Sequence, residues 1–502
     1  MDSETRRVLD LFAQLSAIPR RSKHERAIGD WLIAWAAARS IPAERDATGN
    51  VLFRVKATAG SEHAPTLILQ GHMDMVCEKS AESTHDFDRD PIVPVEDGEW
   101  LRADGTTLGA DNGIAIAIAL ALVDAGIDHP PMEILITVDE ETGLTGAQNL
   151  APGWLTGSLL LNLDSEDEGV FTVGCAGGRT TLLRLPVDRE PVPAGFDPVT
   201  LAVSGLSGGH SGVDVHRGRA NANVLVARIL DVLVGHTDRD GIRVAAIHGG
   251  SAHNAIPRDA RATLYVDADG RAALAAIVDE FARVFAAEYG ATDPALAATT
   301  AGGDRAAICV TDGATVANEA TGGADAVLTT RSASTVAALV MSVPDGVVRM
   351  SRDVDGLVET STNLATIRTT DAIEVGTSQR SSYASRLAEV ASRIEAAARL
   401  AGASVEVQSS YPAWEPAIDS AILTRCRDVY RAEFDADPVV EVIHAGLECG
   451  VIGAKYPGME MISFGPTIRD AHSPAEALHI PSLSRTWRFT TALVRAIARQ
   501  GG

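Results

Sequence analysis

A histidine and an aspartate follow the first strongly apolar segment of the chain. Residues 66–69 have the pattern of a short buried strand, and Gly71 after them permits a sharp turn. The turn brings His72 and Asp74 to the carboxyl end of that strand, the edge where open α/β sheets bind ligands. A histidine with a carboxylate two residues further on is typical of a metal ligand and the residue that orients it.

A third candidate, Asp111, stands where a loop gives way to an almost wholly apolar helix over residues 112–123. A carboxylate at a helix N-terminus can simply cap the helix, because free amides and the helix dipole stabilise it. Capping does not explain why Gly109, Asn112 and Gly113 surround this aspartate. We therefore favour a metal ligand at Asp111.

Two more apolar segments end in carboxylates. Residues 132–138 read as a buried strand followed by Asp139, Glu140 and Glu141, and residues 159–163 as a strand followed by Asp164. Asp164 alone could simply start a turn. However, it is the third case of a potential ligand directly after an apolar strand, following His72 and the Glu140–Glu141 pair. Two adjacent glutamates can divide the work, because one can bind a metal while the other takes a proton from water.

A late histidine, His472, follows one more apolar strand at residues 460–464. Imidazoles and carboxylates together suit zinc, or manganese or cobalt. Five ligands exceed the need of one catalytic metal and suit two ions about 3.5–4 Å apart, bridged by one carboxylate. The candidate ligands are His72, Asp111, Glu141, Asp164 and His472.

The elements around these residues alternate between helices and strands, which predicts an α/β fold. An amphipathic helix spans residues 4–18, and Ser22 with Glu25 fits a capping box for a second helix that ends at Ala37. A cluster of prolines near residues 186–198 marks a boundary, after which a second α+β unit begins. We expect a catalytic domain formed by residues 1–184 and 404–502, with residues 185–403 inserted as a lid domain.

Composition limits the possible partners and location. With 502 residues the chain is too long for one compact core. A net charge of −24 argues against nucleic acid and anionic membranes as partners. The five scattered cysteines form neither a disulfide framework nor a cysteine zinc site, and the charged N-terminus has no signal-peptide pattern. We expect a reduced, cytoplasmic protein.

Several phrases of the sequence together resemble the co-catalytic zinc peptidases, a clan that includes carboxypeptidase G, aminoacylases and dipeptidases. The similarity runs almost end to end and is closest to bacterial dipeptidases. The phrases that carry it are QGHMDMVCEK, GADNGIA, DEETGLTGA, LNLD, GLSGGHSGVDVHRGRANAN, TSTNLA, HAGLECG and RDAHSPAE. The resemblance implies a zinc-peptidase catalytic domain with a mixed central sheet flanked by helices.

The resemblance also implies a role for each site residue. Asp111 bridges two metal ions, and the Asp111–Asn112 peptide is cis. His72 and Asp164 complete one metal shell, while Glu141 and His472 complete the other. Asp74 orients His72, and Glu140 is the general base.

Residues of the inserted domain are expected to bind the substrate. The clan implies that His210 donates to the tetrahedral oxyanion, in many members from the partner subunit, so a homodimer is expected. Arg380 could clamp the C-terminal carboxylate of a dipeptide with its planar fork. Structural roles remain equally open for two residues of the last segment, Glu448 and His444. The expected substrate-binding residues are Arg380, Asn254, Asn363, Glu448 and His444.

The sequence therefore predicts a di-metal dipeptidase that acts on Xaa-His dipeptides such as carnosine and on other dipeptides. Two alternatives stay open. An N-acyl amino acid deacylase would share the same machinery. A non-catalytic metal- or peptide-binding protein would use the same scaffold, although it has no need of a base such as Glu140.

Overall fold

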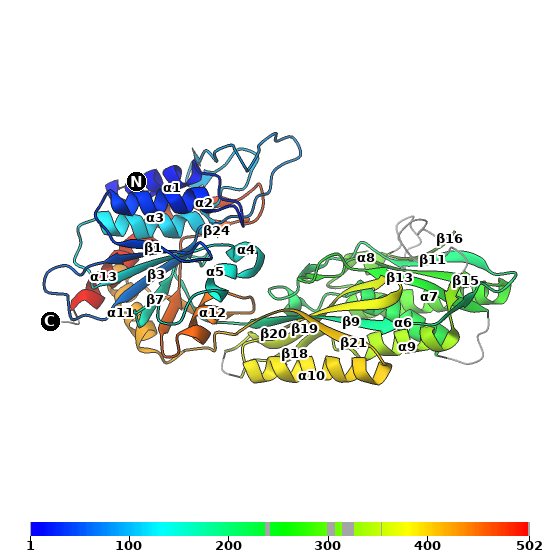
Figure 1. The fold of residues 1–502 in the computed structure, drawn as a ribbon. Coiled ribbons are helices and arrows are strands. Elements are labelled where there is room, and N and C mark those ends of the chain that lie inside the picture. Colours follow the sequence, from blue (N-terminus) through cyan, green and yellow to red (C-terminus); the bar gives the residue numbers. More distant parts are fainter. Residues whose placement is uncertain (1, 236–240, 299–306, 314–325, 353, 500–502) are drawn as a thin grey trace. The chain divides into compact units, whose positions relative to one another are not determined.

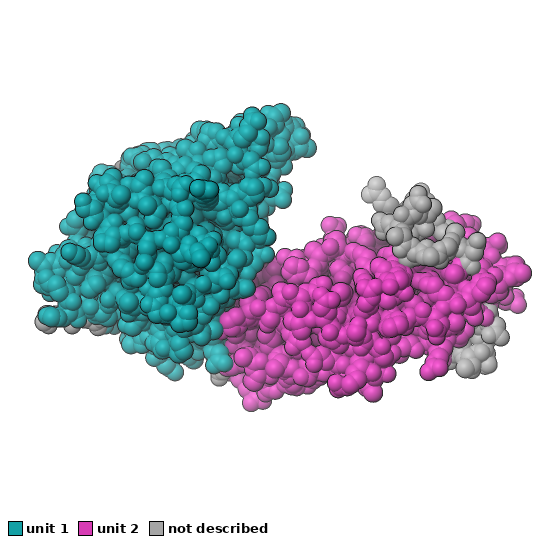
Figure 2. Space-filling view, in the orientation of Figure 1, with its two compact units in different colours: residues 1–175, 414–442, 447–502 teal, residues 176–413, 443–446 magenta. Residues whose placement is uncertain are grey.

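The computed structural model describes residues 2–235, 241–298, 307–313, 326–352 and 354–499. They form two compact units (Figure 2): unit 1 contains Met1–Cys175, Trp414–Val442 and Leu447–Gly502, and unit 2 contains Ala176–Ala413 and Ile443–Gly446. Unit 2 begins before residue 185 and ends after residue 403, because β9 (Gly177–Pro186) pairs with β21 (Ser404–Tyr411).

Unit 1 is built on an eight-stranded mixed sheet (Figure 1). Its central strands β6, β3, β7 and β23 run parallel, and antiparallel strands flank them. This mixed sheet with its helices confirms the predicted α/β class. In spatial order the strands are β1 (Ala43–Arg45), β2 (Val51–Val55), β6 (Met132–Thr137), β3 (Leu67–His72), β7 (Leu159–Asn162), β23 (Glu460–Ser463), β8 (Val170–Cys175) and β22 (Val439–Ile443).

Helix α3 packs against β3, and α1 covers α3. This arrangement explains why α3 is apolar on all sides, since it is buried between the sheet and another helix. The helices of unit 1 are α1 (Ser3–Ser16), α2 (Arg26–Ala37), α3 (Ala110–Asp124), α4 (Glu140–Gly143), α5 (Thr145–Gln148), α11 (Ala421–Phe434), α12 (Glu448–Lys455) and α13 (Ile480–Ala498).

The predicted capping box before the second helix is wrong. Helix α2 begins at Arg26, and Glu25 in the capping position makes no side-chain capping bond. The Ser22 hydroxyl donates to Asp74, and the Glu25 carboxylate accepts from the backbone amide of Asp139. Both side chains thus reach distant loops, where a local sequence pattern cannot reveal their partners.

A small four-stranded sheet supports the segment that carries His472. Strands β24 and β25 pair antiparallel, and the turn between them contains His472. The strands are β24 (Ile468–Arg469), β25 (Ala477–His479), β5 (Trp100–Arg102) and β4 (Val95–Asp97).

Unit 2 has its own nine-stranded sheet and its own apolar core. Helix α6 packs against β11, β13 and β15, and α10 packs against β9 and β20. The strands are β9, β11 (Asp197–Val203), β13 (Ile242–Gly249), β15 (Ala260–Val266), β16 (Ile308–Asp312), β18 (Gly346–Met350), β19 (Val358–Thr369), β20 (Ala372–Ser381) and β21. The main helices are α6 (Ala222–Val234), α7 (Ala268–Tyr289), α9 (Thr330–Ser342) and α10 (Ala384–Ala401).

Shorter elements complete unit 2. They are β10 (Arg189–Pro191), β12 (Gly209–His210), η1 (Val215–Arg217), β14 (Ala255–Ile256), α8 (Pro294–Ala298) and β17 (Ala326–Leu328). Across both units, none of the helices within the described ranges has the length and apolar character needed to cross a membrane.

Candidate active site

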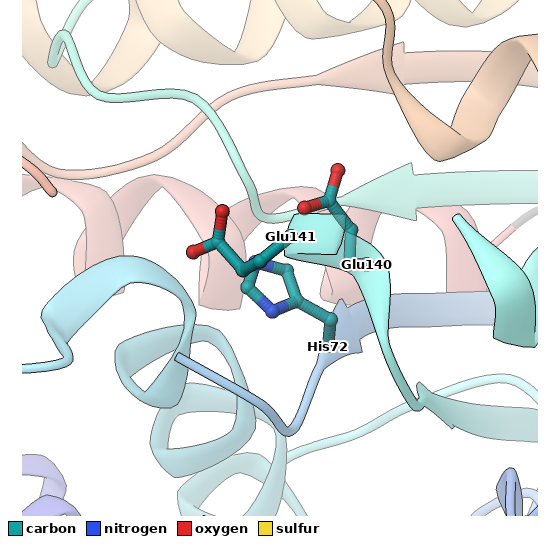
Figure 3. A group of neighbouring side chains, drawn as sticks. All are labelled: His72, Glu140 and Glu141. Atoms are coloured by element: carbon teal, nitrogen blue, oxygen red, sulfur yellow. The ribbon is translucent and has the colours of Figure 1, made fainter. Parts of the chain in front are cut away.

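The carboxyl ends of β6, β3 and β7 meet at one edge of the sheet in unit 1, because these three strands are parallel neighbours. His72 ends β3, Asp164 follows β7 by two residues, and Glu140 and Glu141 begin α4 after β6. Figure 3 shows His72 at the end of its strand, with both glutamates on the short helix. His72, Glu140 and Glu141 each offer one ligand atom, and these three atoms lie within 4.8 Å of one another.

Asp111 links two groups of candidate ligands. Its Oδ1 lies 3.2 Å from His72 Nε2, which is also 3.4 Å from Asp164 Oδ1. Its Oδ2 lies 3.1 Å from His472 Nε2, which is also 3.1 Å from Glu141 Oε2. The five predicted ligands therefore form two clusters that share one carboxylate.

This donor set fits a pair of divalent ions. Among the described residues, Glu141 Oε1 is buried and makes no hydrogen bond. A buried carboxylate oxygen normally finds a donor, so this one suits a ligand. Imidazole nitrogens and carboxylate oxygens in this number match zinc, manganese or cobalt.

The charges within the clusters shift one another's pKa values. Burial lowers the pKa of His72, but the carboxylates of Asp164 and Asp111 outweigh burial and raise it well above its usual value. Hydrogen bonds to Asp111 and Glu141 raise the pKa of His472 to about 11. Without a cation, the two imidazoles would carry the positive charge that the surrounding carboxylates attract.

Glu140 lies beside the two clusters but is not part of the His72–Asp111 or the His472–Asp111 pair. Burial, followed by the charges of neighbouring carboxylates such as Asp164 and Glu141, raises the pKa of Glu140 well above its usual value. Its backbone amide donates to Asp74 Oδ1 at 3.1 Å, and the amide of Glu141 donates to Asp74 Oδ2 at 3.3 Å. Asp74 Oδ1 also lies 3.3 Å from His72 Nδ1, so one carboxylate orients His72 and both glutamates.

Asn112 ties the Asp111 loop to the strand ends. The Asp111–Asn112 peptide bond is cis, as the family resemblance implies. The amide of His72 donates to Asn112 Oδ1 at 3.2 Å, and Asn112 Nδ2 donates to the Leu163 carbonyl at 2.9 Å. Asp111 therefore faces His72 and His472 instead of capping α3, whose capping residue is Gly109.

Three predicted residues of unit 2 converge around Gly212. A side chain there would meet the His444 carbonyl, Arg380 and His210. His210 Nδ1 accepts from the amides of Gly212 and Val213 at 3.2 and 3.0 Å. Burial, followed by the charges of Arg380 and His210, lowers the pKa of His444 to about 3.

The other predicted substrate residues differ in their surroundings. Asn254 is exposed, while Asn363 is buried and donates to the Ala255 carbonyl at 2.8 Å. Glu448 belongs to unit 1 and is completely buried. Its Oε2 accepts from Gln70 and Thr137 at 2.6 Å each, and its Oε1 has no partner.

The sequence interpretation missed several residues that support the site. Buried Arg20 and Glu476 contact the loop that carries Asp111, and Tyr411 contacts Arg380. The only sequence signal for Glu476 is its place in the HSPAE phrase, four residues after His472. Arg20 and Tyr411 lie outside every recognised phrase.

Comparison with known proteins agrees with this site. The sequence profile of "Peptidase family M20/M25/M40" matches residues 68–496. The chain is 40% identical over 490 residues to the cytosol non-specific dipeptidase of Escherichia coli (strain K12), and the alignment covers 97% of each protein.

Solved structures show the same fold. The crystal structure of an aminoacylhistidine dipeptidase from Vibrio alginolyticus matches with a TM-score of 0.83 and 40% identity, covering 97% of this chain and 96% of that one. Human carnosine dipeptidase 1 matches with a TM-score of 0.51 and 11% identity over 99% and 97% of the two chains, which shows a shared fold alone. From the extent of the profile match and of the 40% identity, we conclude that the chain belongs to the peptidase family M20/M25/M40.

Proposed function

We propose that the chain is a di-metal dipeptidase that hydrolyses Xaa-His dipeptides such as carnosine, together with other dipeptides. One observation carries the proposal: the two carboxylate oxygens of Asp111 face two imidazoles in two clusters, and Glu140 lies beside them. The names of the two relatives that are 40% identical over almost the whole chain support this substrate class.

We infer that His72, Asp111 and Asp164 hold one ion, and that Asp111, Glu141 and His472 hold the other. Zinc is the expected metal, and manganese and cobalt suit the same ligands. When bound, such ions polarise the scissile carbonyl and lower the pKa of a water molecule. The protein's own part is to place these ligands on rigid strand ends and to supply the proton carrier.

Glu140 is the proposed general base. Its buried surroundings favour the protonated form, so a proton taken from the attacking water is held until the leaving amine accepts it. Asp74 fixes the position of Glu140 by accepting a hydrogen bond from its backbone amide, and it also orients His72. The same carboxylate thus sets the positions of a metal ligand and the base.

Arg380 is the proposed partner of the substrate's C-terminal carboxylate, and His210 is the proposed donor to the oxyanion. Among the described residues Arg380 pairs with the Tyr411 hydroxyl and with no carboxylate, so its charge suits an anionic ligand. We retain Asn254, Asn363, His444 and Glu448 as further candidates for substrate contacts. The name of the cytosolic relative supports a cytoplasmic location. A homodimer remains part of the proposal, on the family resemblance of the sequence alone.

The substrate class is tested with the metal-stripped protein after zinc, manganese or cobalt is restored. Xaa-His dipeptides, other dipeptides and N-acetyl amino acids are compared by kcat/KM. We expect the dipeptides to be hydrolysed faster. A marked preference for N-acetyl amino acids would instead assign the chain as a deacylase.

The role of Glu140 is tested with Glu140→Gln. We expect kcat to fall about 10²–10⁴-fold, because a positioned general base contributes about that much. Metal content should not change, since Glu140 is not a proposed ligand. Glu133→Gln is a matched control, because Glu133 is buried near the opposite end of β6. Unchanged turnover in Glu140→Gln would remove Glu140 from the mechanism.

A further inference from the structure

Residues 108–111 lead into α3 and include its first two residues, of which Asp111 has a non-helical backbone. This loop lies between two buried side chains of opposite charge. Glu476 is 3% exposed, and within the described part of the chain its carboxylate accepts hydrogen bonds from this loop's backbone alone. Its Oε2 accepts from the amides of Leu108 and Gly109 at 2.7 and 2.9 Å, and its Oε1 accepts from the amide of Asp111 at 3.2 Å. A carboxylate from the β24–β25 turn region thus holds the backbone of the shared metal ligand.

Arg20 approaches the same loop from the connection between α1 and α2. Its side chain is 2% exposed and, as far as residues 2–499 are described, donates to backbone carbonyls alone. One terminal nitrogen reaches the carbonyls of Met73 and Asp74 at 3.1 and 3.0 Å, and the other reaches the Gly109 carbonyl. Arg20 therefore joins the end of β3, where His72 and Asp74 lie, to the loop that carries Asp111.

The two glycines of the GADNG phrase make room for this arginine. A Cβ on Gly109 would lie 2.5 Å from an Arg20 terminal nitrogen, and a Cβ on Gly113 would lie 2.6 Å from it. Gly109 also has a positive φ of 70°, which favours glycine. The guanidinium consequently passes close to the backbone on both sides of Asp111.

We propose that Arg20 and Glu476 are positioning residues that fix Asp111 where it can serve both metal clusters. The loop turns its amides toward the carboxylate and a carbonyl toward the guanidinium, so charge-assisted hydrogen bonds hold it from two directions. A shift of the loop would leave a buried charge without its partners, which is strongly unfavourable. Because Asp111 is taken as a metal ligand, the inference rests on the proposed function.

Glu476→Gln tests the carboxylate. Glutamine keeps the volume but offers one acceptor oxygen in place of two, so an amide of the loop loses its partner. We expect the affinity of the metal-free protein for zinc, measured by competition with a chromophoric chelator, to fall about 10- to 100-fold, as for other outer partners of metal ligands. The visible spectrum of the cobalt-loaded variant should also change, because that spectrum reports ligand geometry.

Glu133→Gln is the matched control. Glu133 is also buried, accepts from the amides of Thr156 and Gly157 at 2.9 and 3.0 Å, and pairs with Arg54. It lies near the start of β6, away from the strand ends that carry the ligands. We expect this variant to lose stability while zinc affinity and the cobalt spectrum stay at wild-type values.

Arg20→Lys is an independent variant that decides the question if Glu476→Gln does not fold. Lysine keeps the charge but lacks the fork, so it cannot reach both strand β3 and the loop. Wild-type zinc affinity and cobalt spectrum in the folded variants would overturn the inference, as would equal losses in Glu133→Gln. If the wild-type protein itself binds no divalent metal, the proposed function fails together with the inference. If the wild-type protein binds zinc and the Glu476 and Arg20 variants bind it equally well, the inference alone fails.

Discussion

At the scale of single residues, Arg380 is a buried cation held by a neighbouring ring. Its side chain is 8% exposed and donates to the Tyr411 hydroxyl at 2.9 Å. The tyrosine ring packs closely on Gly178 and Gly446, where any side chain would collide with it. Tyr411 therefore orients the guanidinium that we assign to the substrate carboxylate.

Replacing Arg380 should remove the preference for a free C-terminus. We expect Arg380→Met to lower kcat/KM for an Xaa-His dipeptide about 10- to 100-fold, since hydrogen bonds to charged groups contribute about 1.5–3 kcal/mol. The corresponding dipeptide amide, which lacks the carboxylate, should be affected much less. Tyr411→Phe, which keeps the ring, should show a smaller loss with the same selectivity. Equal losses on both substrates would contradict the clamp.

His444 makes the stability of unit 2 depend on pH. Its folded pKa of about 3 lies below the ordinary value of 6.5, so folding favours the neutral ring. The resulting stabilisation is complete well above pH 6.5 and is lost as the pH falls toward 3, by up to about 5 kcal/mol at about 1.36 kcal/mol per pKa unit. Urea unfolding at several pH values should therefore show a flatter pH dependence in His444→Gln than in wild type. Parallel curves would show that His444 does not titrate in this way.

The side chains that form the two clusters could be found from the sequence because each follows an apolar strand or begins an apolar helix, and strand ends converge in a parallel sheet. Their role as metal ligands stays a proposal. Arg20 and Glu476 could not be found in this way, because their partners are backbone groups distant in the sequence. Ser22 and Glu25 show the same limit. Their spacing matched a local cap, whereas Ser22 donates to Asp74 and Glu25 accepts from the amides of Lys23 and the distant Asp139.

At the scale of elements, the contact between β3 and α3 sets the place of Asp111. A Cβ on Gly71 would collide with Asn112 Oδ1 and lie 2.8 Å from the Ala115 Cβ, both on the helix. Because Asn112 follows Asp111 directly, separating the strand from the helix would also move Asp111, the proposed shared ligand.

We therefore expect Gly71→Ala to reduce the free energy of unfolding by about 1–3 kcal/mol, the usual effect of overpacking, and to lower metal content. Gly453→Ala is a suitable control, because its Cβ would meet only the flexible end of the Met461 side chain, with Cε at 2.6 Å. Denaturant unfolding and elemental analysis measure the two effects. Normal metal content in Gly71→Ala would show that the helix can shift without loss of the site.

One element shows where pattern reasoning ends. The strand beginning at Ser404 was expected to return to the first domain, but β21 pairs with β9 in the sheet of unit 2. The sequence pattern of a strand predicts which residues are extended, but it does not predict which other strand they pair with.

At the scale of the whole molecule, the two units differ in how the chain builds them. The core of unit 2 comes from one continuous segment, between Leu183 and Ala398. In unit 1, β23 (Glu460–Ser463) lies between β7 and β8, which come about 300 residues earlier in the chain.

A fragment of residues 176–413 should therefore fold alone, whereas residues 1–175 should not, since their sheet lacks β23. Far-UV circular dichroism with thermal melting would show a cooperative transition for the first fragment and none for the second. Adding residues 414–502 to the second fragment is the natural control. A cooperative transition in residues 1–175 alone would contradict this account of the sheet.

The position of β23 has a consequence for the time at which activity can begin. Synthesis proceeds from the N-terminus, and β23, His472 and Glu476 all follow the main segment of unit 2, Ala176–Ala413, in the chain. A polypeptide still being made can therefore fold unit 2 before the proposed metal ligands have all been synthesised. On the proposed mechanism, no dipeptide would be cleaved until translation has passed Glu476.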